Sequence, residues 1–333
     1  MFLHYLKIAI RNSSRDKFQF LIKTIGLALS MFCAMLIILW IDDERSYEAF
    51  WPDSDRIYRL VQHAQFDDGT VFKAASNPGV MPGYLKDNYT GIEEFTRFRP
   101  SLDKVLMEYK NTKFYEDVTY VDSTFFKVFQ LPFLVGNPQN ALKNPNSMVI
   151  TERTAEKYFG KDWQLETVLG KFISVNKNEQ YSVSGIIESL PSNTHFKFDI
   201  LLPFSKLIEN GWYMGWENNS YYVYFLLQKN TDVQALSAQI VQFAESREDI
   251  ADIFYLQPVS RIHLYSDFDI DVYGSTELRN PYVNIFMAVA FVIILIAGIN
   301  FMNLSTAQSE KRSKEIGLRK TIGSLRFQSS FNY

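Results

Sequence analysis

The chain has 333 residues, of which 47% are hydrophobic and 16% aromatic, and a formal net charge of −3 at pH 7. Its 28 Phe and 19 Tyr residues exclude a disordered tether, because so many aromatic side chains can form a packed core. One cysteine cannot form a disulfide within the chain. No Gly-x-x-x-x-Gly-Lys-Ser/Thr loop occurs, so any ATP dependence must come from a partner protein.

Residues Met1 to Arg11 have helical periodicity. Leu3, Leu6 and Ile10 fall on one side, and basic residues spaced by four fall on another. Such a segment suits the cytoplasmic surface of a membrane, where basic residues meet anionic lipid. We therefore expect residues 1–19 to form a cytoplasmic amphipathic helix. The alternative is a simple cytoplasmic extension of the apolar segment that follows.

Residues 20–41 are predicted to form a first transmembrane helix. The stretch Thr24–Ile41 contains no charged residue, and about 20 mostly apolar residues are needed to cross a bilayer core. The segment is not typical of a cleaved signal peptide. Asp42-Asp43-Glu44-Arg45 follows at once, and no small-residue cleavage site is present.

Between residues 42 and 280 short alternating strands mingle with short helices, which predicts a mixed α+β domain rather than a doubly wound sheet. A threonine and a following acid predict the helix that starts at Thr151, and Gly160 should end it. We expect strands at 56–66, 70–75, 93–98, 105–109, 113–121, 172–175, 181–187, 196–202, 221–228, 254–259 and 263–272, and helices at 78–88, 151–160 and 233–245.

Residues 281–307 are predicted to form a second transmembrane helix, followed by a cytoplasmic segment at 308–333. The apolar residues Ile316, Leu318 and Ile322 in that segment are interrupted by two glycines. This pattern favours a short amphipathic element that docks on another protein. The alternative is the ordinary basic flank of a membrane helix.

Charge predicts the orientation of the two spans. Eleven basic and three acidic residues lie outside the spans, and removing them from the chain totals of 34 and 37 leaves 23 basic and 34 acidic residues. Basic residues near span ends are retained in the cytoplasm. Both termini should therefore be cytoplasmic and the acidic middle domain extracytoplasmic.

Small and carboxamide side chains mark possible helix contacts within the spans. Gly26, Ser30 and Ala34 recur every four residues, which would allow another helix to approach closely. Asn300 and Asn303 are costly against lipid, so their face should meet another helix, a helix end or water.

No residue pattern predicts catalysis, a cofactor or a metal. The histidines, His4, His63, His195 and His263, are far apart and are expected on the surface or in strands. The run Asp267–Asp271 suggests calcium, but it lacks the glycine and glutamate of an EF-hand loop. A strand in which apolar residues alternate with aspartates explains this run better, with the aspartates facing water.

Five segments carry a family resemblance: Tyr5–Asn12, Asp43–Tyr47, Asp55–Arg59, Asn300–Ala307 and Arg312–Lys320. Together they resemble the MacB/FtsX-type permeases of ABC transporters, in the version with a MacB-like periplasmic core domain after the first span. The resemblance extends over nearly the whole chain, and the last segments are its most specific part.

The resemblance implies a transporter permease without catalytic activity, for a lipoprotein, peptide or drug. Its implied partners are a separate ATPase, membrane lipids, and a second permease copy or a missing C-terminal half; nucleic acid is not among them. It also implies a porter-like part at 53–111 plus 201–273, with a β-rich part inserted between them. The residues implied to contact the ATPase are Lys311, Arg312, Lys314, Glu315, Ile316, Gly317, Arg319 and Lys320.

The sequence departs from the family pattern in one respect, and two alternative functions stay open. Family members continue into at least two further membrane helices, whereas this sequence leaves the pattern near Leu325 and stops at Tyr333. We therefore expect a truncated chain or one half of a larger machine. A two-span sensor with a ligand-binding periplasmic domain is the main alternative, and it should continue into a long heptad helix. A membrane-anchored enzyme would need clustered ionisable residues.

Overall fold

The computed structural model describes residues 17–65, 69–165, 167–177, 179–209, 211–212, 214–247, 252–269 and 279–321. The chain divides into a folded unit, Glu44–Asn280, and a helical unit formed by Met1–Asp43 and Pro281–Tyr333. The predicted amphipathic helix at 1–19 lies almost wholly outside the described residues, as does the end of the predicted cytoplasmic segment. The predicted α+β class between two apolar helices is confirmed.

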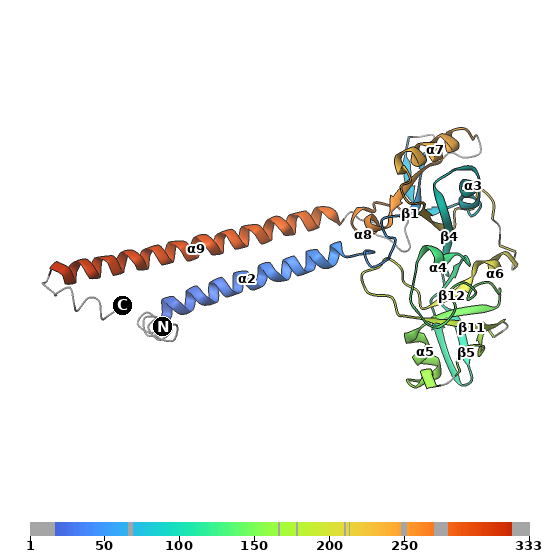
Figure 1. The fold of residues 1–333 in the computed structure, drawn as a ribbon, viewed down its shortest axis with the longest axis horizontal. Coiled ribbons are helices and arrows are strands. Elements are labelled where there is room, and N and C mark those ends of the chain that lie inside the picture. The colour runs from blue at the N-terminus through green and yellow to red at the C-terminus, as the bar shows by residue number, and fades with distance from the viewer. Residues whose placement is uncertain are drawn as a thin grey trace. The chain divides into compact units, whose positions relative to one another are not determined.

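The helical unit consists of α2 (Lys17–Arg45) and α9 (Asn280–Thr321), which lie side by side in Figure 1. Thr24–Arg45 in α2 and Asn280–Asn303 in α9 are long and apolar enough to cross a membrane, judged by length and composition. Only 11% of each apolar window is buried. They are therefore not the core helices of a soluble domain, which would be largely covered.

α9 extends beyond the predicted membrane span. The short amphipathic element expected around Gly317 lies within this helix, because α9 runs unbroken through Gly317 to Thr321. A glycine inside a helix costs only about 1 kcal/mol relative to alanine, and strong helix formers surround this one. Near the end of the helix, the Thr321 hydroxyl donates to the Leu318 carbonyl at 2.8 Å.

One half of the folded unit is a βαββαβ arrangement with antiparallel strands in the order β14-β1-β13-β4. Leu60 and Phe225 on the sheet pack with Leu85 and Ile240 of the two helices, so the helices cover one face. We call this half the porter part. Its elements are β1 (Ile57–Gln65), α3 (Met81–Asn88), β4 (Ile92–Pro100), β13 (Tyr221–Leu227), α7 (Val233–Glu245) and β14 (Asp252–Pro258).

The other half, which we call the inserted part, lies in sequence between β4 and β13. It extends the same sheet in the order β7-β12-β9-β11-β10-β5-β6, with β7 parallel to β12 and β9 parallel to β11. Figure 1 shows it with α5 at the end away from α7. Its elements are β5 (Val105–Tyr109), β6 (Thr112–Glu116), β7 (Val118–Val121), β9 (Ser147–Thr151), α5 (Glu152–Phe159), β10 (Phe172–Val175), β11 (Glu179–Ile187) and β12 (Ile200–Pro203).

Shorter elements complete the unit. β2 pairs with β1, β3 with β13 and β8 with β11. These elements are β2 (Val71–Ala74), β3 (Ser76–Asn77), α4 (Phe125–Val128), β8 (Phe133–Gly136), η1 (Trp163–Leu165), α6 (Phe204–Glu209), η2 (Val259–Arg261) and α8 (Ile262–Tyr265).

Strand pairing moves both borders of the porter part from those implied by the family resemblance. β5 pairs with β10 and β6, so the porter part ends near Pro100 instead of residue 111. β12 pairs with β7 and β9, so the porter part resumes near Tyr221 instead of residue 201. Sequence alternation shows that a segment is a strand, but it does not show which strand is its neighbour.

The strand expected at 263–272 is wrong over its first residues. Ile262–Tyr265 forms the short helix α8, because Ile262 and Leu264 are both buried when the chain turns here. Phe268 is buried as the alternation predicted. Residues 270–272 lie outside the described part of the chain.

An aromatic core joins the two halves. Phe196, in the segment before β12, packs against Phe98 of β4 with ring centroids 4.7 Å apart and against Phe129 at 4.8 Å. Phe129 in turn contacts Tyr224 of β13 at 5.2 Å. Aromatic pairs at such distances stabilise by more than their buried area alone. The two halves therefore share one core.

We predict that Gly136→Ala lowers the free energy of unfolding of the full chain by about 3 kcal/mol. Gly136 has φ 103°, and an added Cβ would lie 2.6 Å from the Ser184 carbonyl oxygen. Gly170 has φ 81° with open space at its Cβ, so Gly170→Ala should cost only about 1 kcal/mol. Urea unfolding in neutral detergent measures both, and equal losses would contradict the close approach at Gly136.

Candidate functional site

The last turn of α2 carries a buried carboxylate that bridges three elements. Glu44 Oε2 accepts a hydrogen bond from Nε2 of His263, in α8, at 2.7 Å. Arg279, which directly precedes α9, places Nη1 3.7 Å from Glu44 Oε1. The His263 ring stacks on Tyr47 with centroids 3.4 Å apart. One side chain thus ties the end of α2 to α8 and to the residue before α9.

The protonation state of His263 follows from its surroundings. Burial lowers the pKa of His263, and the hydrogen bond and charge of Glu44 oppose that effect without cancelling it. The imidazole is therefore neutral at pH 7. Because Glu44 accepts, the Nε2 atom carries the proton.

A second glutamate, four residues later, is fully buried. Glu48 accepts hydrogen bonds from Trp51 Nε1 at 2.7 Å, from Thr194 Oγ1 at 3.0 Å and from the His195 amide. Its own amide donates to the Asn193 carbonyl at 3.0 Å. Its φ of 63° lies in the left-handed region, which a glutamate adopts only when its surroundings hold it there.

The network continues from Glu48 into the centre of the sheet. His195 Nδ1 lies 2.9 Å from Glu48 Oε1, but the geometry is not that of a good hydrogen bond. On the other side of the ring, His195 Nε2 lies 2.7 Å from the hydroxyl of Tyr224 in β13. Burial alone raises the pKa of Glu48, but His195 and Trp51 together hold it below its usual range. The residues after α2 are thereby fastened to a central strand of the porter part.

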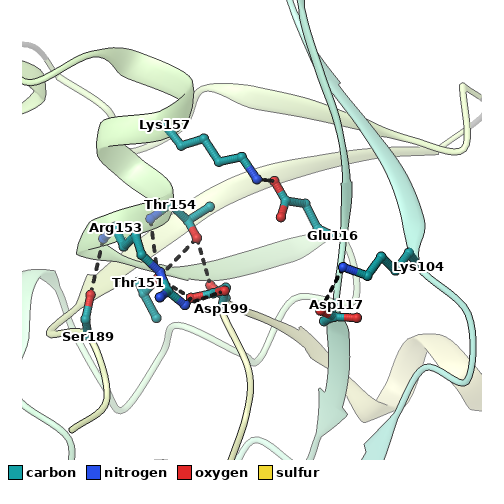
Figure 2. Close-up of polar contacts among 9 residues, drawn as sticks. All are labelled: Lys104, Glu116, Asp117, Thr151, Arg153, Thr154, Lys157, Ser189 and Asp199. Carbon is teal, nitrogen blue, oxygen red and sulfur yellow. Dashed lines mark hydrogen bonds and ion pairs between the residues drawn. The ribbon is translucent and has the colours of Figure 1, made fainter. Parts of the chain in front are cut away.

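The segment from Ser189 to Asp199, which carries Thr194 and His195, is held at both ends by Arg153 of α5, and Figure 2 shows these two contacts. Asp199 accepts two contacts from Arg153 Nη2, at 2.6 and 2.8 Å, and one from Thr151 Oγ1 at 3.2 Å. Ser189 Oγ accepts from the Arg153 amide at 3.3 Å. Thr151 also caps α5 by accepting from the Thr154 amide, which confirms the predicted helix start.

The predicted contact residues of the two apolar helices fall in different places. Gly26 and Ser30 of α2 and Asn300 of α9 line one crevice of about 160 Å³. Ala34 is buried, whereas Asn303 is exposed. The structure thus brings three of the five residues to one crevice between the helices.

The eight residues expected to contact an ATPase all lie on the last turns of α9. Lys314 and Gly317 are exposed, and Lys314 Nζ pairs with Glu310 at 2.8 Å along the helix. Their role as a docking segment stays a prediction. The side chains of Lys311, Arg312, Glu315, Ile316, Arg319 and Lys320 lie outside the described part.

The structure also bears on what was expected of the aspartate run at 267–271 and of His195. Asp267 and Asp269 both bind Lys73, through its Nζ atom at 2.7 Å and its amide at 2.8 Å. Asp271 lies outside the described residues, within which no group of three metal-ligating side chains occurs. His195 was expected on the surface or in a strand, and this is wrong, because it is buried in a loop.

Sequence reasoning missed the most connected residues of this site. Glu48 looks like any acid at a membrane boundary, and its burial depends on partners about 147 residues away in sequence. The one available signal was its place directly after the Asp43–Tyr47 motif. Contacts of such long range leave no local pattern.

Comparison with known proteins identifies the family of this chain. The model of the MacB-like periplasmic core domain matches residues 20–243. The chain belongs to this family. A domain of a putative permease protein from Porphyromonas gingivalis shares the fold, with a TM-score of 0.54 and 20% identity over 62% of this chain and 91% of that one.

The curated relatives are considerably longer than this chain. The macrolide export ATP-binding/permease proteins MacB of Salmonella paratyphi A and Salmonella typhi are 23% identical over 233 residues. The match covers 67% of this chain and 33% of each relative. The chain therefore spans about a third of the length of the curated relatives it matches.

We predict that Glu48→Gln lowers the free energy of unfolding at pH 7 by about 3 kcal/mol, because it breaks a buried charged network. Glu93→Gln is the matched control, since Glu93 forms a half-exposed ion pair with Arg56 and should cost less than about 1 kcal/mol. Urea unfolding of the full chain, followed by tryptophan fluorescence, measures both losses.

The loss caused by Glu48→Gln should depend on pH. The folded-state pKa of Glu48 is lowered from 4.5, so its stabilisation is complete above that pH and is lost as the pH falls through the folded value. The difference between wild type and variant should therefore shrink below about pH 4.5. A difference that stays constant down to pH 3 would contradict this assignment.

Proposed function

We propose that this chain conveys ATPase-driven motion across the inner membrane to its folded unit, as the permease part of an ABC transporter. The observation that carries the proposal is α9 itself. A single helix of 42 residues, about 63 Å long at about 1.5 Å per residue, joins the folded unit to the basic segment expected to meet the ATPase. No hinge interrupts this connection within the described residues.

The junction at Glu44 makes such a transfer physically reasonable. Arg279 directly precedes α9 and pairs with Glu44 at the end of α2, while Glu44 also holds α8. A displacement of either helix end therefore pulls on the same carboxylate. Glu48 and His195 then connect this point to β13, a central strand of the sheet.

The ATPase is proposed to be a separate chain, as the family resemblance implies, and the 333 residues themselves contain no P-loop. Both ends of the sequence are proposed to face the cytoplasm, supported by the basic residues outside the two apolar helices. A second permease copy or further permease helices would complete the assembly. The transported compound is proposed to be a lipoprotein, a peptide or an amphiphilic drug.

We predict that Gly317→Leu and Arg319→Ala each reduce co-purification with the cognate ATPase by about tenfold, the equivalent of about 1.4 kcal/mol of binding free energy. Ser313→Ala is the control, because Ser313 is exposed on the same helix and is not among the expected contacts. Pull-down from membranes in neutral detergent measures the ratio. Undiminished binding by both variants would contradict the docking role of this segment, and a sensor would bind no ATPase at all.

A further inference from the structure

An arginine lies where the porter part meets the inserted part. Arg99 of β4 stands directly opposite Tyr120 of β7. On the other side of β4, the antiparallel register with β13 pairs Phe98 with Tyr222. The next position along this register places Tyr221 opposite Arg99. Tyr221, Arg99 and Tyr120 thus form a row across three neighbouring strands.

The guanidinium of Arg99 is stacked on an indole ring. Its Cζ atom lies 3.9 Å from the centroid of Trp212, whose side chain is 38% exposed. Such stacking orients the guanidinium plane but uses none of its N–H groups. The side chain is half-buried, and Nε is fully buried without a hydrogen-bond partner, whereas the two terminal nitrogens are not buried.

Three other arginines of the folded unit are paired with carboxylates. Arg56 binds Asp53 and Glu93, Arg97 binds Asp122, and Arg153 binds Asp199. Among the described residues, the guanidinium of Arg99 has neither a hydrogen-bond acceptor nor an ion-pair partner. Burial and the charge of Glu179 both raise the pKa of Tyr120, which neighbours Arg99. Glu179 accepts a hydrogen bond from Tyr181 and not from Arg99.

An unpaired half-buried cation is costly to the folded protein. Burial lowers the pKa of Arg99, which means that the surroundings disfavour its charge. Charges taken out of water are normally compensated by an opposite charge, and the Arg99 guanidinium has none among the described residues. An anion at the terminal nitrogens would supply the missing charge and two hydrogen bonds.

We propose that Arg99 is an oxyanion-binding residue, and that a carboxylate or phosphate group binds end-on to its two terminal nitrogens beside Tyr120 and Trp212. The planar guanidinium fork matches the two oxygens of such a group. The exposed part of Trp212 offers a surface for an apolar body attached to the anion. This site lies apart from Glu44 and Glu48, and it does not depend on the proposed transport function.

The test is fluorine NMR of the full chain in neutral detergent, with its five tryptophans replaced by 5-fluorotryptophan. Trp212→Phe assigns the Trp212 resonance. Acetate and inorganic phosphate are titrated separately against chloride at constant ionic strength. We expect a saturable shift of the Trp212 resonance with at least one of them. A shift with acetate alone identifies a carboxylate ligand, and a shift with phosphate alone identifies a phosphate ligand. Shifts with both anions identify a general oxyanion site.

Arg99→Gln should abolish the saturable shift. Arg153→Gln is the matched control, because it removes an equal charge from a side chain that is 73% exposed and already paired with Asp199. A linear, non-saturating response in the wild type would overturn the proposal, as would unchanged saturation in Arg99→Gln. If Arg99→Gln does not fold, Arg99→Lys keeps the charge without the fork. It should bind at least about tenfold more weakly, and equal affinity would overturn the end-on geometry.

Discussion

The apolar surface of α2 and α9 is the constraint on which the rest of the molecule depends. Leu29, Phe32 and Ile296 are 59%, 58% and 60% exposed, and many neighbours are alike. Leaving such a side chain in water instead of an apolar environment costs about 1.5–3 kcal/mol. Lipid is the environment that covers two such helices in a member of this permease family. Two crossings bring the chain back, so we propose that both ends lie opposite the folded unit.

We propose that two glutamates form the mechanical connection. Glu44, in the last turn of α2, is the first residue of the folded unit and binds His263 within it. Glu48 is fastened to His195 and, through it, to Tyr224. Buried carboxylates with several partners are stiff points, because removing any partner leaves a charge unsatisfied. The aromatic core around Phe196 then joins the porter and inserted parts. A force at the helix ends would therefore reach both parts.

Local patterns predicted much of the fold and little of the site. Alternation located β1 and β13 to within a residue or two, and Thr151 identified the start of α5. The borders of the porter part could not be predicted, because they depend on which strands pair across tens of residues, as β12 does with β7. The burial of Glu48 and His195 was missed for the same reason. The sequence did not show that the segment around Gly317 continues α9, because one glycine costs too little to end a helix.

The membrane topology is the most direct test of the account. In a Cys33→Ala background, single cysteines are placed at Tyr115, which is 65% exposed in the folded unit, and at the exposed Ser309 of α9. A membrane-impermeant maleimide is then applied to spheroplasts. The account predicts that Tyr115→Cys is labelled at once and Ser309→Cys only after the membrane is disrupted. Labelling of Ser309→Cys in intact spheroplasts, with Tyr115→Cys protected, would contradict it.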